Sequence, residues 1–275
     1  MVHVYGDDGA DEKREKAISV AVVGGLEEMW QELEEKWIAR CNGIPFHAKD
    51  CESDRGEYEG MPHELNKATY RDLTTLLAAS RVGGIAIAID IVAQRKIFPN
   101  ALRIAYYRAF AETVERAASL AEYAGEVAEL TFDISTENEY NARLIYSSIR
   151  ESDARLARWL HPRISFVSAR HSPRIQTADL LAYEAWKALD HTVGEVKRKR
   201  GSWMALRETK RFETISYTEE WFSDLRKHIQ SGEAEKVAGF NEDCYKKWLL
   251  GRNRQHNLSN LFTFIGLQDK KGSGD

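Results

Sequence analysis

Cysteine is scarce in this chain, and no apolar run is long enough to cross a membrane. The cysteines are Cys41, Cys51 and Cys244; they form no Cys-x-x-Cys pair and no histidine cluster accompanies them, so we expect no zinc site. The odd count and the lack of a secretory leader predict a reducing, cytoplasmic location. A membrane-spanning helix needs about 20 consecutive apolar residues, so we expect no membrane partner.

The chain also lacks a strong charge of either sign. Its formal net charge is −4, so the overall composition gives no support for binding a polyanionic nucleic acid, although a local basic patch remains compatible with it. With 275 residues, 43% of them hydrophobic, the chain suits one large α/β domain, or such a domain with a helical appendage.

Hydrophobic periodicity predicts a strand hairpin followed by alternating strands and helices. Strands are expected at 2–7, 17–25, 82–92, 126–133 and 163–168. Helices are expected at 26–41, 62–80, 100–124 and 137–160, and from Ser172–Pro173 onward, where serine suits the N-cap and proline the first helical position. This order predicts an α/β fold with a mixed five-stranded sheet flanked by helices.

The domain organisation follows from this order of elements. We expect the sheet within residues 1–190, with a helical segment inserted at 26–80. Residues 191–267 have helical patterns without clear strands and predict a helical C-terminal extension. The last residues, 268–275, read QDKKGSGD and are expected to be disordered.

Three aspartates stand where this order should bring them together. Asp7 ends the first strand, Asp133 ends the fourth, and Asp179 lies in the first turns of the last core helix. Carboxylates that converge repel one another, so their convergence indicates a bound cation. Mg²⁺ and Mn²⁺ prefer oxygen ligands, and two such ions can support hydrolysis of a phosphodiester bond.

Each aspartate also has an ordinary explanation. An Asp after a strand is usually a turn residue or a helix cap. For Asp133 that explanation is weaker, because Thr136 and Glu139 already form a capping box for the next helix. Asp179 borders an apolar helix face, where a carboxylate is costly unless satisfied, but the helix dipole also favours Asp near an N-terminus. The two interpretations of Asp179 are about even.

Further acidic residues and one histidine are candidates for the same site. Asp8 points to the opposite strand face from Asp7, so we prefer Asp7 and keep Asp8 as a second metal ligand. His47 and Asp50 lie in a polar segment, where a histidine is more often a surface or packing residue. Glu137 can reach the same metal, although a glutamate in a first helical turn also has a dipole explanation.

Positive charge gathers in one stretch after the predicted sheet. This stretch contains Lys197, Arg198, Lys199 and Arg200, followed by Trp203. Such a run can follow a phosphate backbone, with the tryptophan stacking on a base. A solvated helix face is the commoner explanation for it.

Four phrases of the sequence form a recognisable set: VYGDDGA at 4–10, PFHAKD at 45–50, LTFD at 130–133 and SARHSPRIQTADLLAYEAWKAL at 168–189. Together they resemble the domain-of-unknown-function family numbered 3800 (DUF3800), which is related to the ribonuclease H and integrase superfamily. In the family's first motif a glutamate and a serine follow the aspartate, whereas Asp8 and Gly9 follow Asp7 here. The last phrase is the most specific, and together the phrases spread over most of residues 1–190.

The resemblance implies a ribonuclease H-like fold and a metal-dependent nuclease that cuts DNA or RNA with Mg²⁺ or Mn²⁺. It implies that Asp7, Asp133 and Asp179 are the catalytic, metal-binding positions, and it adds His47 because Phe46–His47 matches the family's aromatic-His step.

Three more residues near this site have proposed supporting roles. Gln176 matches a family glutamine that precedes the helix aspartate, and we expect it to orient Asp179 by a hydrogen bond. Arg170 and Arg174 lie beside the site in sequence and are candidates for phosphate contact.

Two rival functions stay open. One is a non-catalytic module of the same fold that binds nucleic acid or protein. The other is a metal-dependent phosphoryl hydrolase acting on a small nucleotide. A long basic groove would favour a polymeric substrate, and a closed pocket would favour a small one. Homo-oligomer formation also stays open.

Overall fold

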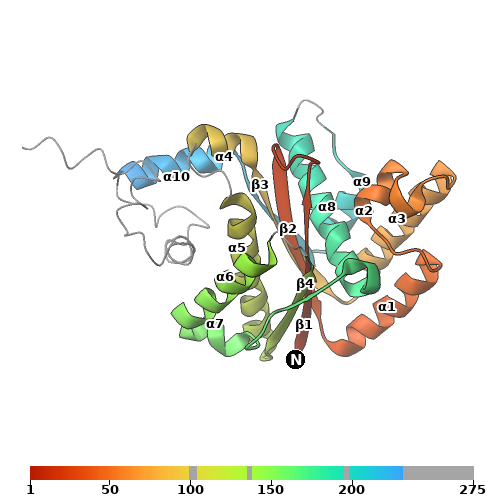
Figure 1. Cartoon of the computed structure of the whole chain (residues 1–275), viewed down its shortest axis with the longest axis horizontal. Helices are drawn as coiled ribbons and strands as arrows, with labels where there is room; N and C mark the ends of the chain where they lie inside the picture. Colours follow the sequence, from red (N-terminus) through yellow and green to blue (C-terminus); the bar gives the residue numbers. More distant parts are fainter. Residues whose placement is uncertain (99–103, 135–137, 195–197, 232–275) are drawn as a thin grey trace, which may run out of the picture.

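The computed structural model describes residues 1–98, 104–134, 138–194 and 198–231, and it has a mixed β-sheet between two layers of helices (Figure 1). The described strands form one six-stranded sheet in the order β5-β4-β1-β2-β3-β6. Their bounds are β1 Val2–Ala10, β2 Ala17–Gly25, β3 Gly83–Asp90, β4 Ala128–Asp133, β5 Ser165–Val167 and β6 Phe212–Tyr217.

The sheet combines antiparallel and parallel pairs. β2 runs antiparallel to both β1 and β3, while β4 is parallel to β1, β5 to β4 and β6 to β3. Parallel neighbours end at the same edge of a sheet, so the carboxyl ends of β1 and β4 lie together.

Helices cover both faces of the sheet (Figure 1). One face carries α1 Glu27–Cys41, α2 Ala48–Ser53, α3 His63–Ala79, α8 Pro173–Val193 and α9 Gly201–Glu208. The other carries α4 Ile91–Ile97, α5 Ile104–Ala124, α6 Glu139–Ser152, α7 Ala154–Trp159 and α10 Glu219–Ser231. Among the described helices, none combines the length and the apolar character that a membrane span requires.

The two faces of the central strands carry side chains of different size. β2 and β3 point Val20, Val22, Ile87 and Ile89 toward α5, and they point Ala17, Ala21, Ala86 and Ala88 toward α8. Small side chains on one face allow a helix to pack close to the sheet, because little volume separates the two backbones. α8 therefore lies nearer the sheet than a helix packed on isoleucine or valine could.

Direct contacts between α8 and the sheet confirm this close approach. The Ser19 hydroxyl of β2 donates a hydrogen bond of 2.6 Å to the Ala182 carbonyl of α8. A Cβ on Gly9 would lie only 3.1 Å from the α8 backbone. The sheet and α8 thus form a tight unit, and a side chain on the sheet side of α8 is placed directly against the strands.

The structure corrects two of the expected elements. The C-terminal extension at 191–267 is not purely helical, because β6 lies within it and pairs with β3, and this gives a sixth strand. β6 is an edge strand whose inner residues are only partly buried, so its hydrophobic alternation is weak. The single helix expected at 137–160 is two helices, because the Asp153 side chain caps α7 by accepting hydrogen bonds from the N–H groups of Arg155 and Leu156.

Other expected bounds agree only in part, because the first strand continues past Asp7 to Ala10 and the strand expected at 82–92 ends at Asp90, where α4 follows from Ile91. The strand at 17–25 is confirmed, as are the Ser172 cap and the Pro173 start of α8. Residues 232–275, which include the predicted tail at 268–275, lie outside the described residues, and so do Thr136 and Glu137.

Candidate active site

Asp7 and Asp133 are neighbours on the face of the sheet that α8 covers. Asp7 pairs with Ala21, which belongs to the α8-side core. Phe132 belongs to the opposite core, so the next residue, Asp133, points toward α8. Because Gly6 pairs with Phe132 in parallel register, the residues that follow them, Asp7 and Asp133, lie side by side.

Glycine at position 6 is required for this register. A Cβ on Gly6 would lie 2.3 Å from the Phe132 ring. That ring packs on Phe110 of α5 and on Phe166 of β5, so it has little room to move. Gly6 therefore lets the aspartate-bearing segments of β1 and β4 pair closely.

α8 supplies the third carboxylate. Asp179 is only 4% exposed, and its Oδ2 accepts a hydrogen bond of 2.7 Å from the backbone N–H of Ala48. Ala48 is the first residue of α2, and an N–H there has no acceptor within its own helix. Asp179 lies beyond the first turn of α8, so the dipole of its own helix does not account for an aspartate at this position. The hydrogen bond to Ala48 instead connects Asp179 to the start of α2.

The carboxylates interact electrostatically across the site. Burial raises the pKa of Asp7 well above its usual value, and the charges of Asp179, Asp133 and Asp8 raise it further. Burial likewise raises the pKa of Asp179 to about 6. Acids from three separate elements therefore lie close enough to oppose one another's ionisation, which a bound cation would relieve.

Asp133 is held by the loop that follows β5. Its Oδ1 accepts a hydrogen bond of 2.6 Å from the backbone N–H of Ala169, at the start of the 3-10 turn Ala169–His171. Burial raises the pKa of Asp133, and the N–H groups of Ala169 and Ile134 lower it. The carboxylate is thus oriented by backbone groups that do not titrate.

Gln176 supports this loop. Its Nε2 donates a hydrogen bond of 3.0 Å to the Ala169 carbonyl oxygen, and its Oε1 accepts one of 3.0 Å from Trp37 Nε1. Gln176 therefore acts on the loop that holds Asp133, whereas we expected it to orient Asp179.

His47 and Asp50 adjoin the carboxylates through α2. His47 Nδ1 lies 2.9 Å from Asp50 Oδ2. Burial lowers the pKa of His47, but the charges of Asp179 and Asp50 outweigh it, and the net shift is upward. His47 also lowers the pKa of Asp133 and of Asp179 by its charge. The structure therefore brings His47 into the site, with its side chain half exposed.

Asp8 lies on the other face of the sheet. It pairs with Val20, which points toward α5, and its carboxylate lies 3.1 Å from the Arg14 guanidinium. The expected alternation of Asp7 and Asp8 is thus present, and Asp8 has a cation partner away from Asp179. This placement disfavours Asp8 as a second metal ligand.

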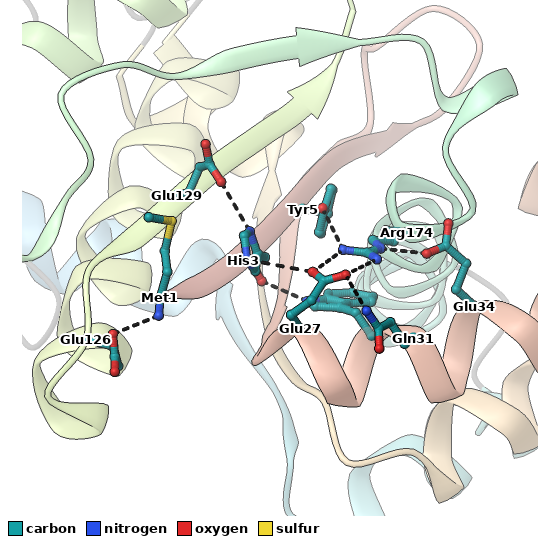
Figure 2. A network of polar contacts seen from close by, with 10 residues as sticks. Met1, His3, Tyr5, Glu27, Gln31, Glu34, Glu126, Glu129 and Arg174 are labelled. Carbon is teal, nitrogen blue, oxygen red and sulfur yellow. Dashed lines mark hydrogen bonds and ion pairs between the residues drawn. The ribbon is translucent and has the colours of Figure 1, made fainter.

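Arg174 has acidic partners of its own, as Figure 2 shows. Its guanidinium makes two hydrogen bonds of 2.8 Å to Glu27 and one of 2.8 Å to Glu34, and it also donates to the Tyr5 hydroxyl. The side chain is 15% exposed. Arg174 fastens the start of α8 to α1, so the structure gives it an anchoring role where we expected phosphate contact.

Arg200 and Trp203 are likewise turned inward. Arg200 makes hydrogen bonds of 2.9 and 2.6 Å to Glu184, which is fully buried, and its own side chain is 6% exposed. Trp203 is buried in the α8-side core, so it is not available to stack on a base. Arg198 and Lys199 are exposed, and Lys197 lies outside the described residues.

Sequence reasoning missed the backbone donors of the site. Ala48 and Ala169 act through their N–H groups, which every residue except proline possesses, so their residue type carries no signal. The close packing of α8 did leave a signal, in the small residues on one face of β2 and β3.

The donor set suits a hard divalent cation, because it consists of carboxylate oxygens, those of the buried Asp179 and of the partly buried Asp7 and Asp133. One oxygen of each aspartate accepts a backbone N–H, and for Asp7 the donor is the N–H of Asp8 at 2.7 Å. The candidate ligand atoms are thus Oδ2 of Asp7, Oδ2 of Asp133 and Oδ1 of Asp179. Within the described ranges, no three His, Cys, Asp or Glu side chains already stand in metal-holding positions, so binding requires the side chains to adjust.

The chain was also compared with known proteins. Neither a protein-family model nor a curated protein matches it.

Proposed function

We propose that this chain is a divalent-metal-dependent nuclease, a hydrolase of phosphodiester bonds in DNA or RNA. Asp7, Asp133 and Asp179 hold Mg²⁺ or Mn²⁺. One observation carries the proposal: β1 and β4 place Asp7 and Asp133 side by side on the sheet face that α8 covers, and the charge of the buried Asp179 on α8 reaches Asp7.

The sheet supports a ribonuclease H-like fold. β1, β2 and β3 are successively antiparallel, and β4 and β5 continue in parallel beside β1. These five strands support the mixed sheet that the order of elements predicts, with β6 added beyond β3. Asp133 lies at the carboxyl end of β4, where α/β proteins commonly place ligands, and Asp7 lies beside it in the carboxyl-terminal half of β1.

The residues around the carboxylates prepare them to bind a cation. When bound, the metal ions would activate the attacking water and stabilise the leaving oxygen. The N–H groups of Ala48 and Ala169 hold Asp179 and Asp133 in fixed orientations, so less ordering is needed on binding.

His47 is the proposed group for proton transfer. Asp50 lies against Nδ1 of His47, which favours the tautomer with its hydrogen on that nitrogen. Nε2 is then left to take a proton from water or to give one to the leaving oxygen.

A metal-dependent hydrolase of a small nucleotide is the second candidate. Arg174, Arg200 and Trp203 are engaged inside the protein, so they cannot form the nucleic-acid track that the sequence suggested. This observation weakens the case for a long polymer, and it leaves the chemistry at the aspartates unchanged.

The proposal can be tested by cleavage assays that include a matched control variant. Single-stranded DNA, duplex DNA, RNA and bis(p-nitrophenyl) phosphate are incubated with the protein and Mg²⁺ or Mn²⁺. Asp133→Asn should abolish cleavage while the circular dichroism spectrum persists. Asp72→Asn, in an aspartate on the surface of α3 that pairs with Arg40, should leave cleavage unchanged.

Each outcome has a defined meaning. Cleavage of the small diester alone supports the second candidate. A wild-type protein that cuts no substrate with either metal contradicts both proposals, and if it binds nucleic acid it is a binding module.

A further inference from the structure

Two exposed arginines near the acidic site are each paired with one exposed glutamate. Arg55 Nη1 lies 2.8 Å from Glu12 Oε1, and Arg170 Nη2 lies 2.6 Å from Glu57 Oε1. The arginine side chains are 64% and 62% exposed. We call these two ion pairs the rim pairs.

Short connections tie both arginines to groups of the site. Arg170 directly follows Ala169, whose N–H holds the β4 aspartate. The N–H of Arg55 donates a hydrogen bond of 3.0 Å to the Asp50 carbonyl oxygen, and the Asp50 carboxylate pairs with His47. Arg170 is thus connected through Ala169 to the aspartate of β4, and Arg55 is connected through Asp50 to His47.

The glutamates come from segments that also border the site. Glu12 lies in the turn between β1 and β2, shortly after Asp7 along the chain, and Glu57 lies in the 3-10 turn Gly56–Tyr58. The rim pairs therefore join three segments: the β1–β2 turn, the residues after α2, and the loop after β5. These segments, or the elements next to them, carry the carboxylates and the histidine.

The rim pairs differ in kind from the ion pairs of Arg174 and Arg200. Those two arginines are largely buried, and removing a partner from a buried pair leaves an uncompensated charge. An exposed pair contributes little net stability, so an arriving anion can replace its carboxylate easily. Arginine binds phosphate through charge-assisted, often bidentate, hydrogen bonds.

We propose that Arg55 and Arg170 are the phosphate-binding residues of the site and exchange Glu12 and Glu57 for phosphate oxygens of the substrate. The ligand chemistry is a pair of neighbouring phosphates, from an oligonucleotide or from a small nucleotide. The inference rests on the proposed function, because it places the substrate at the acidic site. It keeps the expectation that Arg170 contacts phosphate, adds Arg55, and replaces the expectation for Arg174 and the 197–203 stretch.

The test is that replacing the arginine and replacing the glutamate of a rim pair should change the affinity for an oligonucleotide in opposite directions. A fluorescein-labelled deoxythymidine octanucleotide is titrated with full-length protein in EDTA, and anisotropy is measured. Arg55→Gln and Arg170→Gln should each weaken binding about tenfold. Each should also lower the slope of log affinity against log salt by about 1. Glu12→Gln and Glu57→Gln should tighten binding roughly threefold, because they remove the competing carboxylate.

A matched pair on the other face of the sheet is the control. Arg155 of α7 and Glu122 of α5 form a similarly exposed ion pair of 3.4 Å. Arg155→Gln and Glu122→Gln should change affinity less than about twofold, because exposed charges a Debye length or more away are largely screened. Displacement of the probe by thymidine 3′,5′-bisphosphate distinguishes a small-nucleotide site from one that needs a longer chain.

Several results would overturn the inference. Weaker binding in the glutamate variants as well would make the rim pairs structural supports. Equal changes of affinity in the control pair would show that the effect reflects only the net charge of the protein. A wild-type protein that does not bind the oligonucleotide would contradict the inference. Cleavage of the same oligonucleotide with Mg²⁺ is scored separately. Arginine-dependent binding without cleavage contradicts the nuclease alone, and cleavage with arginine-independent binding contradicts only this inference.

Discussion

Replacing Asp179 with asparagine should stabilise the metal-free protein at alkaline pH. Burial raises the pKa of this carboxyl group from 3.8 to about 6, and the neighbouring Asp133 adds to the rise. The folded protein therefore keeps the proton to about pH 6, whereas the unfolded chain loses it near pH 3.8. Because the folded state binds more protons in this window, stability falls as pH rises through it.

The size of the effect follows from the shift. The difference between 6 and 3.8 is about 2 units, and each unit is worth about 1.4 kcal/mol, so ionised Asp179 costs the fold about 3 kcal/mol. Asparagine removes the charge and still offers an oxygen to the N–H of Ala48. Its amide hydrogens need new acceptors, which costs about 1 kcal/mol. The net gain is about 2 kcal/mol, or roughly 4–8 °C in Tm.

Urea unfolding in EDTA, followed by tryptophan fluorescence, measures this gain. Asp179→Asn and wild type are compared at about pH 8, above the window, and at about pH 4, close to its lower limit. The gain should be present at the higher pH and absent at the lower one, and Asp72→Asn should show no such difference. Equal destabilisation of Asp179→Asn at both pH values would refute the electrostatic argument for a cation site.

Four further outcomes are expected. Mg²⁺ added to metal-free wild type should raise its Tm, less so in the Asp179 variant, and an unchanged Tm would count against the site. Gln176→Leu should cost about 1–3 kcal/mol in urea unfolding and lower kcat, because it leaves the buried Trp37 indole N–H and the partly buried Ala169 carbonyl unpaired. Gly6→Ala should cost about 2 kcal/mol by overpacking against Phe132, with partial recovery in a double variant with Phe132→Leu. Arg200→Met should cost about 3–5 kcal/mol by stranding the Glu184 charge, and a loss below about 1 kcal/mol would contradict that.

Much of the sheet was predictable from local pattern. The strand at 17–25 and the Ser172–Pro173 helix start follow from apolar runs and capping chemistry, and both are confirmed. β6 escaped prediction because an edge strand with partly exposed residues has weak alternation. The break at Asp153 escaped because a capping aspartate within a helical pattern looks like a solvated residue.

The sequence placed Asp133 correctly at the end of its strand, whereas β1 runs on past Asp7 to Ala10. Strand alternation alone separates Asp7 from Asp8, and the structure confirms that they face opposite sides of the sheet. The position of Asp179 on the sheet side of α8 follows from helical periodicity. These properties depend on neighbours within a few residues along the chain, which a sequence displays directly.

The partners of the charged side chains were decided only by the tertiary structure. Arg174, Arg200, Arg55 and Arg170 look alike in sequence, yet the first two are anchored inside and the last two stay exposed. An ion pair joins segments that are far apart along the chain, and its strength depends on how much water surrounds it. The partner of a charged side chain and its exposure to water are both fixed only when the helices pack on the sheet. Local pattern therefore determines which face of an element a residue lies on, and packing determines which residues it contacts there.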